Sequence, residues 1–87
     1  MKLEADRITN VNAAQLLQLG EAAIAAGDSS FDLSSVTRCD SSAVALLLGW
    51  RRTAQAHGTR LQLQAVPASL RSLATLYGVE DLIDPAG

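Results

Sequence analysis

A polar stretch, Asp40 to Ser42, runs directly into six apolar residues, Ala43 to Leu48, and this junction constrains the fold more than any other part of the chain. Aspartate and serine are preferred at the start of a helix, where their side-chain oxygens accept unpaired backbone N–H groups. A helix that is apolar on every side is a buried helix. The junction therefore predicts a buried central helix over about residues 41–57, with hydroxyl groups at an end that faces outward.

Strand and helix patterns alternate along the rest of the chain. Apolar residues at every second position predict strands over 2–8 and 60–66, and a short segment between turn residues predicts another over 30–33. Apolar residues at helical spacing predict helices over 13–26 and 68–77. The last of these places Tyr77 on one face with the apolar residues of its helix.

Capping residues mark the ends of the predicted helices. Asn10 or Asn12 is positioned to cap the first helix. Gly27, Gly58 and Gly78 follow the three helices in chain order, and glycine commonly ends a helix. Each predicted helix therefore has an end that the sequence itself marks.

The resulting order is strand, helix, strand, helix, strand, helix. This order is typical of an α/β fold, and crossovers between parallel strands are nearly always right-handed. We therefore expect a short, mostly parallel sheet with helices packed against it, in a single domain over residues 1–87. Residues 34–39 are expected to form a loop with Val36 turned inward.

Composition excludes several classes of protein. Apolar residues make up 48% of the chain, which excludes a disordered, charge-rich protein. The aromatic residues are Phe31, Trp50 and Tyr77, and the net charge is −2, so a basic groove with stacking rings for nucleic acid is not expected. Trp50 and Tyr77 are expected on helices, either packed in the core or, alternatively, at a partner surface.

The sequence also indicates a compartment. Cys39 is the single cysteine, which excludes an internal disulfide and suits a reducing environment. Charged residues near the N-terminus replace the apolar core of a signal peptide. The longest apolar run is far shorter than the roughly 20 residues of a transmembrane helix. We therefore expect a soluble, cytoplasmic protein.

Residues for catalysis are not assembled in the sequence. His57 is the only histidine, and about 16 residues of helix separate it from Ser41, or roughly 24 Å. Asp32 and Asp40 flank the same strand–helix connection and are an alternative acid–base pair, although loop capping accounts for both. Ligand spacing for a metal and a glycine-rich phosphate loop are both missing. The sequence therefore predicts no enzyme, no cofactor and no metal site.

Charge is distributed in three blocks. Residues 1–37 carry a net charge of −3 and residues 80–87 also carry −3, whereas residues 38–79 contain five arginines and one aspartate, a net charge of +4. The arginines either occupy the solvated faces of helices or meet an acidic protein partner.

Ser41 has two interpretations from its position. A helix N-terminus presents unpaired N–H groups and a partial positive charge, so a phosphate on a hydroxyl there would be held favourably. Alternatively, Asp40, Ser41 and Ser42 serve only as capping residues.

Three segments together resemble a known family. F-D-L-S-S-V-T-R-C-D-S-S-A-V-A-L-L-L, then L-Q-L after a helix ending in H-G, then P-A-S-L-R-S-L-A-T-L-Y-G-V, are similar to the STAS domain. The resemblance covers about residues 29–83. This family includes anti-sigma factor antagonists and the STAS subunit of the Mla phospholipid-transport ABC system, and the ending L-A-T-L-Y-G-V is closer to the Mla branch.

The resemblance implies a binding module without catalytic activity. In anti-sigma factor antagonists the residue after the motif aspartate is phosphorylated by a kinase, and here that residue is Ser41. In the Mla-like subunit the same position contacts the ATPase subunit, at the cytoplasmic face of the inner membrane. We therefore expect Ser41 as a phosphoacceptor or partner contact, with further partner-binding residues at Asp40, Ser42, Arg51, Arg71 and Tyr77.

Two departures from the family pattern bear on these expectations. The family usually has a glycine next to the phosphoacceptor or two residues after it, where this chain has Ser42 and Ala43. Members also usually begin with two strands before the first helix, and here the N-terminal segment has room for one. An unpaired sheet edge is then expected, which invites pairing with a second copy of the chain.

Overall fold

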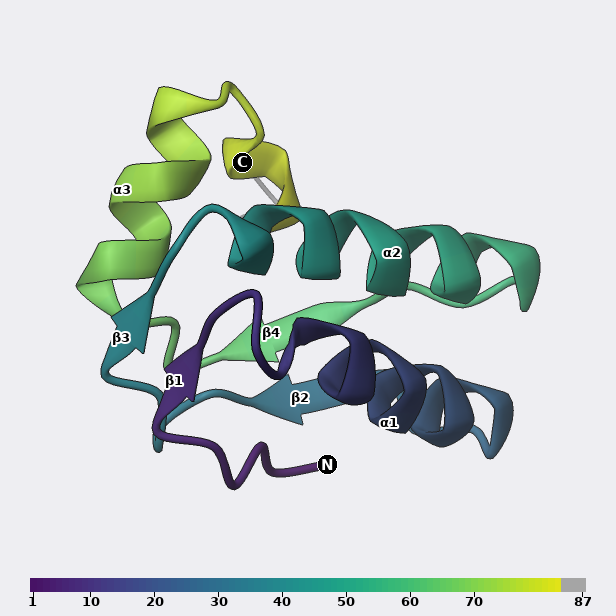
Figure 1. Cartoon of the computed structure of the whole chain (residues 1–87). Helices are drawn as coiled ribbons and strands as arrows, with labels where there is room; N and C mark the ends of the chain where they lie inside the picture. The colour runs from purple at the N-terminus through teal and green to yellow at the C-terminus, as the bar shows by residue number, and fades with distance from the viewer. Residues whose placement is uncertain (84–87) are drawn as a thin grey trace.

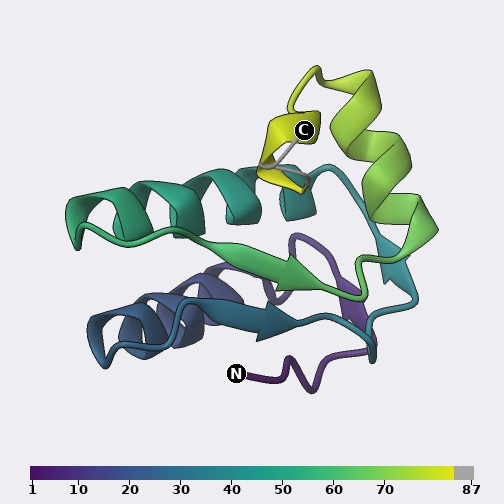
Figure 2. The same ribbon diagram turned by 180° about the vertical axis from the view of Figure 1, so that it is seen from behind.

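Two helices lie side by side in the computed structural model, which describes residues 1–83. α1 and α2 run in the same direction, and the pair β2 and β4 lies on one side of them (Figures 1 and 2). α3 and η1 stand near the start of α2 (Figure 1). The elements in chain order are β1 (Arg7–Ile8), α1 (Ala13–Ala25), β2 (Ser30–Asp32), β3 (Arg38–Cys39), α2 (Ser42–Ala56), β4 (Gln62–Gln64), α3 (Ala68–Leu76) and the 3₁₀ helix η1 (Glu80–Leu82).

The strands form two parallel pairs, β1 with β3 and β2 with β4. In the longer pair, Phe31 lies opposite Leu63. The predicted α/β class with short parallel strands and packed helices is confirmed. The strands, however, are divided between two pairs where one sheet was expected.

Three predicted boundaries are wrong. The strand predicted over 2–8 is interrupted, because Lys2 forms a bridge with Asp32 and the chain then turns to pair β1 with β3. The loop predicted over 34–39 therefore ends in a strand, β3, although Val36 is buried as expected. The strand predicted over 60–66 stops at Gln64, because Ala65 has φ 56°, a left-handed conformation that ends the extended backbone.

The helix ends follow the predictions except at the first cap. Gly27 follows α1 with φ 98°, a conformation that glycine adopts at low cost. Asn12 precedes α1, but its amide oxygen accepts the Thr9 N–H and its amide nitrogen donates to the Arg7 carbonyl oxygen. Asn12 therefore braces the loop before the helix and does not cap the helix with its side chain.

The centre of the core is Trp50 on α2. Its indole ring is fully buried, meets Phe31 edge to face at a centroid distance of 4.8 Å, and donates from Nε1 to the Leu16 carbonyl oxygen at 3.2 Å. Gly20 on α1 lies against the same ring, where an added methyl group would overlap the indole. For Trp50, the core interpretation is therefore confirmed.

The first turns of α2 are buried with one exception. Ala43, Val44, Leu46 and Leu47 are buried, whereas Ala45 is exposed. The expectation of a helix apolar and covered on every side is therefore wrong at Ala45, because α1, α3 and the strands leave that part of the helix surface open. Within residues 1–83, no helix is both long and apolar enough to span a membrane.

Candidate functional site

Asp40 connects the start of α2 to the segment before α1. Its carboxylate accepts the Ser42 N–H at 2.8 Å and the Asn10 N–H at 3.4 Å. Its own backbone N–H donates to the Ile8 carbonyl oxygen at 3.0 Å, which continues the pairing of β1 with β3. Asp40 therefore supplies the cap of α2 and also positions the Asn10 loop beside it.

Ser41 occupies the N-cap position without using its hydroxyl as a cap. The side chain makes no capping hydrogen bond, and only its backbone carbonyl oxygen is used, accepting the Val44 N–H at 3.1 Å. Ser41 is exposed and Ser42 is half-buried. The capping interpretation thus holds for Asp40 and not for Ser41, whose hydroxyl is accessible at the surface.

A hollow lies beside Ser42, between the first turns of α1 and α2. We refer to it as the α1–α2 hollow. The loop before α1 borders it and carries Val11, whose side chain is 91% exposed and lines a neighbouring depression with Asp40. The residues that line the hollow are mostly small or apolar: Asn10, Ala13, Ala14, Leu17, Ser42, Ala45 and Leu46.

The α1–α2 hollow was not predicted from the sequence. It forms only because α1 and α2 pack in parallel with their first turns at the same end (Figure 1). The apolar character of Val11, just before the helix and outside the helical pattern, was the one available signal.

The other expected partner-binding residues lie elsewhere. Arg51 is nine residues beyond Ser42 on α2, which places it about 14 Å along the axis and about 180° around it. There Arg51 pairs with Asp81 next to η1, with Nη1 and Oδ2 2.9 Å apart. Arg71 on α3 is exposed and borders a small hollow with Glu80.

Tyr77 directly follows α3 and is 53% exposed, beside Leu76, which is 75% exposed. The side chain of Tyr77 is therefore not buried with the apolar residues of the last helix, although its backbone N–H still donates to the Leu73 carbonyl oxygen at 3.0 Å. The structure thus separates the predicted residues into a cluster at Asp40, Ser41 and Ser42, and a second region on α2, α3 and η1.

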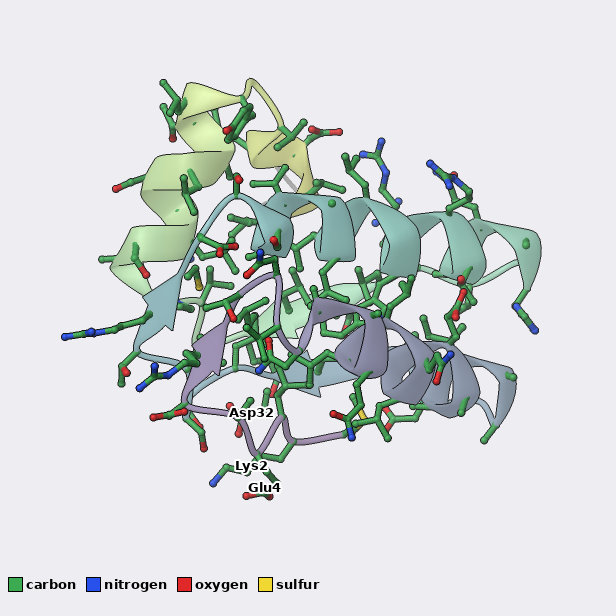
Figure 3. The ribbon with its side chains drawn as sticks, viewed as in Figure 1. Lys2, Glu4 and Asp32 are labelled. Carbon is green, nitrogen blue, oxygen red and sulfur yellow. The ribbon has the colours of Figure 1, made fainter. Side chains whose placement is uncertain are left out.

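Asp32 and Asp40 do not form an acid–base pair. Asp32 is the last residue of β2 and lies beside Lys2 of the N-terminal segment (Figure 3). Its carboxylate accepts the Ser34 N–H at 2.8 Å. Hydrogen bonds from the backbone N–H groups of Ser34 and Ser42, respectively, lower the pKa of both carboxyls. Two carboxyls shifted in the same direction do not provide the separated pKa values that acid–base catalysis requires.

Nucleophilic and metal chemistry have no better support. Burial raises the pKa of the Cys39 thiol, which disfavours the reactive thiolate. His57 is exposed at the end of α2, with Nδ1 3.0 Å from the Thr53 carbonyl oxygen. Among residues 1–83, no group of three or more metal-ligating side chains comes together.

The cap at Asp40 leads to a prediction on pH. Its pKa is lowered in the folded state, so its contribution to stability is complete above the unfolded pKa of about 3.9 and is lost as the pH falls through the folded value. Replacement of Asp40 by asparagine should therefore reduce the loss of stability between about pH 5 and pH 2. Urea unfolding at a series of pH values measures this, with Asp6→Asn as an exposed control. An unchanged pH dependence in Asp40→Asn would contradict the assignment.

The chain is similar to a known protein family. A family model described as "Mlab, STAS domain" matches residues 5–84. No curated protein matches the chain. The match includes every element from β1 to η1, and with them the cluster at Asp40, Ser41 and Ser42.

Proposed function

The chain belongs to the STAS domain family, and on that premise we propose that it is an accessory subunit of an Mla-type phospholipid-transport ABC complex, which binds and supports the ATPase subunit. STAS domains are generally non-catalytic modules that mediate protein–protein interactions. The description of the matching family model, which covers residues 5–84, supports the specific role that we propose. In this role the protein acts at the cytoplasmic face of the inner membrane, through the complex.

The proposed contact with the ATPase is the surface around Ser41. The accessible hydroxyl of Ser41, the α1–α2 hollow and Val11 lie within one end of the molecule. A polar group beside an apolar depression is a common arrangement at protein interfaces, where buried apolar contacts supply affinity and polar contacts supply orientation. Arg51, Arg71 and Tyr77 form a second, peripheral region of the same proposal.

A second candidate function rests on Ser41 alone. Its hydroxyl is exposed at a helix N-terminus, where a phosphate is electrostatically favoured. An anti-sigma factor antagonist would be phosphorylated there by its partner kinase. The family usually has a glycine next to this position or two residues after it, where this chain has Ser42 and Ala43, and this departure favours the docking role.

Co-purification with the cognate ATPase tests the two functions together. We expect the wild-type chain to be captured and Ser41→Glu to weaken capture about tenfold, or about 1.4 kcal/mol, because a charge would be buried in the contact. Ser34→Glu, at an exposed serine in the loop after β2, is the control and should bind like wild type.

Intact-mass measurement of the chain from its native cells distinguishes the alternative. An added phosphate that is lost in Ser41→Ala, together with no capture of the ATPase, would replace the transport function with the kinase-regulated one. If the ATPase is not captured and no phosphate is found on the chain, both functions are rejected.

A further inference from the structure

A pocket of about 250 Å³ lies along the C-terminal half of α2, between that helix, the segment before β4 and η1. It belongs to neither the cluster at Asp40, Ser41 and Ser42 nor the α1–α2 hollow. We refer to it as the arginine pocket. Its lining consists of an apolar and a polar part: Arg51, Ala54, Gln55, Thr59, Arg60, Leu61, Asp81 and Leu82.

The floor of the arginine pocket is apolar. Ala54, Leu61 and Leu82 are 1%, 6% and 3% exposed, so their side chains belong to the core and present only a small apolar surface to the pocket. A floor of this kind favours a short hydrocarbon group over water, because covering apolar surface is favourable.

The rim is positively charged. Arg60 is exposed and has no ion pair with another residue within 1–83. Arg51 is paired with Asp81, but this pair is on the surface, with 38% and 69% of the two side chains exposed. A surface ion pair of this kind contributes little to stability, so Arg51 can exchange Asp81 for another anion at small cost.

We propose that the arginine pocket binds a small organic anion, whose carboxylate or phosphate group is held by Arg60 and Arg51 and whose short apolar chain covers Ala54, Leu61 and Leu82. Guanidinium groups recognise both headgroups through paired N–H donors. Asp81 occupies Arg51 in the free protein, so it acts as an internal competitor that the ligand displaces.

The end of α2 acts against this binding, but weakly. The carbonyl end of a helix carries a partial negative charge, which disfavours an anion. Here two of the last carbonyl groups are already used, because the Ala54 oxygen accepts the Thr59 N–H at 2.9 Å and the Gln55 oxygen accepts the Gly58 N–H at 3.1 Å. The full charges of the two arginines therefore dominate the pocket.

The test is a titration of the isotope-labelled domain, followed by its backbone amide NMR signals. The probes are hexanoate and butyl phosphate, with acetate, inorganic phosphate and hexanol as partial ligands. We expect saturable shifts at Leu61 and Leu82 in the millimolar range for hexanoate or butyl phosphate, and clearly weaker binding of the partial ligands. The stronger of the two full probes identifies the headgroup.

Two variants should change the affinity in opposite directions. Arg60→Gln removes the unpaired charge and should weaken binding roughly threefold to fivefold, whereas Asp81→Asn removes the competitor and should strengthen it by a similar factor. Both side chains are exposed, so neither change disturbs the core. Arg52→Gln, at an exposed arginine on α2 outside the pocket lining, is the control and should leave the affinity unchanged.

Three results would overturn the proposal. If hexanol binds as tightly as hexanoate, the arginines do not contribute to binding. If acetate binds as tightly as hexanoate, the apolar floor does not contribute. Equal affinities in Arg60→Gln, Asp81→Asn and the control would place the anion elsewhere on the molecule.

Discussion

Gly20→Ala should destabilise the domain by about 3 kcal/mol, although alanine is normally the better helix former by about 1 kcal/mol. Gly20 lies inside α1, a position at which this substitution would ordinarily be favourable. The reversal is expected because the new methyl group would overlap the indole ring of Trp50, within 2.6 Å of its Cδ1 atom.

The indole ring has no free direction in which to move. It is fully buried, contacts Phe31 edge to face and donates a hydrogen bond to the Leu16 carbonyl oxygen. Any shift that relieves the overlap therefore lengthens this buried hydrogen bond or separates α1 from α2, and each of these costs about 1–3 kcal/mol. For a domain of this size the expected fall in melting temperature is roughly 15 °C.

Thermal and urea unfolding measure the effect of Gly20→Ala. Ala22→Gly, at an exposed position in the same helix, is the control and should cost only about 1 kcal/mol. In a double-mutant cycle, Trp50→Phe should make Gly20→Ala less costly, because the smaller ring leaves room for the methyl group. A stabilised Gly20→Ala variant would show that the two helices are not held together in this way.

Ala45→Arg should reduce binding of the proposed ATPase partner by tenfold or more and leave the stability of the domain within about 0.5 kcal/mol of wild type. Ala45 is an exposed residue that lines the α1–α2 hollow, three residues beyond Ser42 on the same helix. An arginine side chain there would fill the hollow and place a charge where an apolar contact is proposed, whereas arginine suits an exposed helical position.

The matched control for this prediction is Ala25→Arg, which makes the same substitution at an exposed alanine in the last turn of α1. Binding can be measured by calorimetry or by surface-immobilised ATPase, with unfolding curves for both variants. If Ala45→Arg binds like Ala25→Arg, the contact with the partner lies outside the α1–α2 hollow, even if the ATPase is the correct partner.

The helices could be predicted from the sequence because their signals are local. Each has apolar residues at helical spacing and a glycine at its end, and α1 and α2 differ from their predicted ranges by a residue at most at either end. The strands β1 and β3 could not be predicted in the same way. Each has two residues, and each is extended only because it pairs with a segment about 30 positions away in the chain.

The same distinction applies to the candidate site. Asp40, Ser41 and Ser42 are adjacent in sequence, so their position at a helix start could be predicted from local preference alone. The α1–α2 hollow and the arginine pocket combine residues from distant segments, such as Ala13 with Ala45 and Arg51 with Asp81. The family resemblance identified Ser41 but did not reveal which capping residue leaves its side chain accessible.

The pairing of the strands determines when the protein can fold during its synthesis. β2 is parallel to β4, so its hydrogen-bonding partner is translated about 30 residues later. Until Gln64 has left the ribosome, β2 is paired on one side only, with the segment at Lys2, and the edge that later pairs with β4 stays open. The nascent chain therefore exposes apolar surface until β4 has been synthesised. We expect folding to be completed late, when nearly the whole domain has been released.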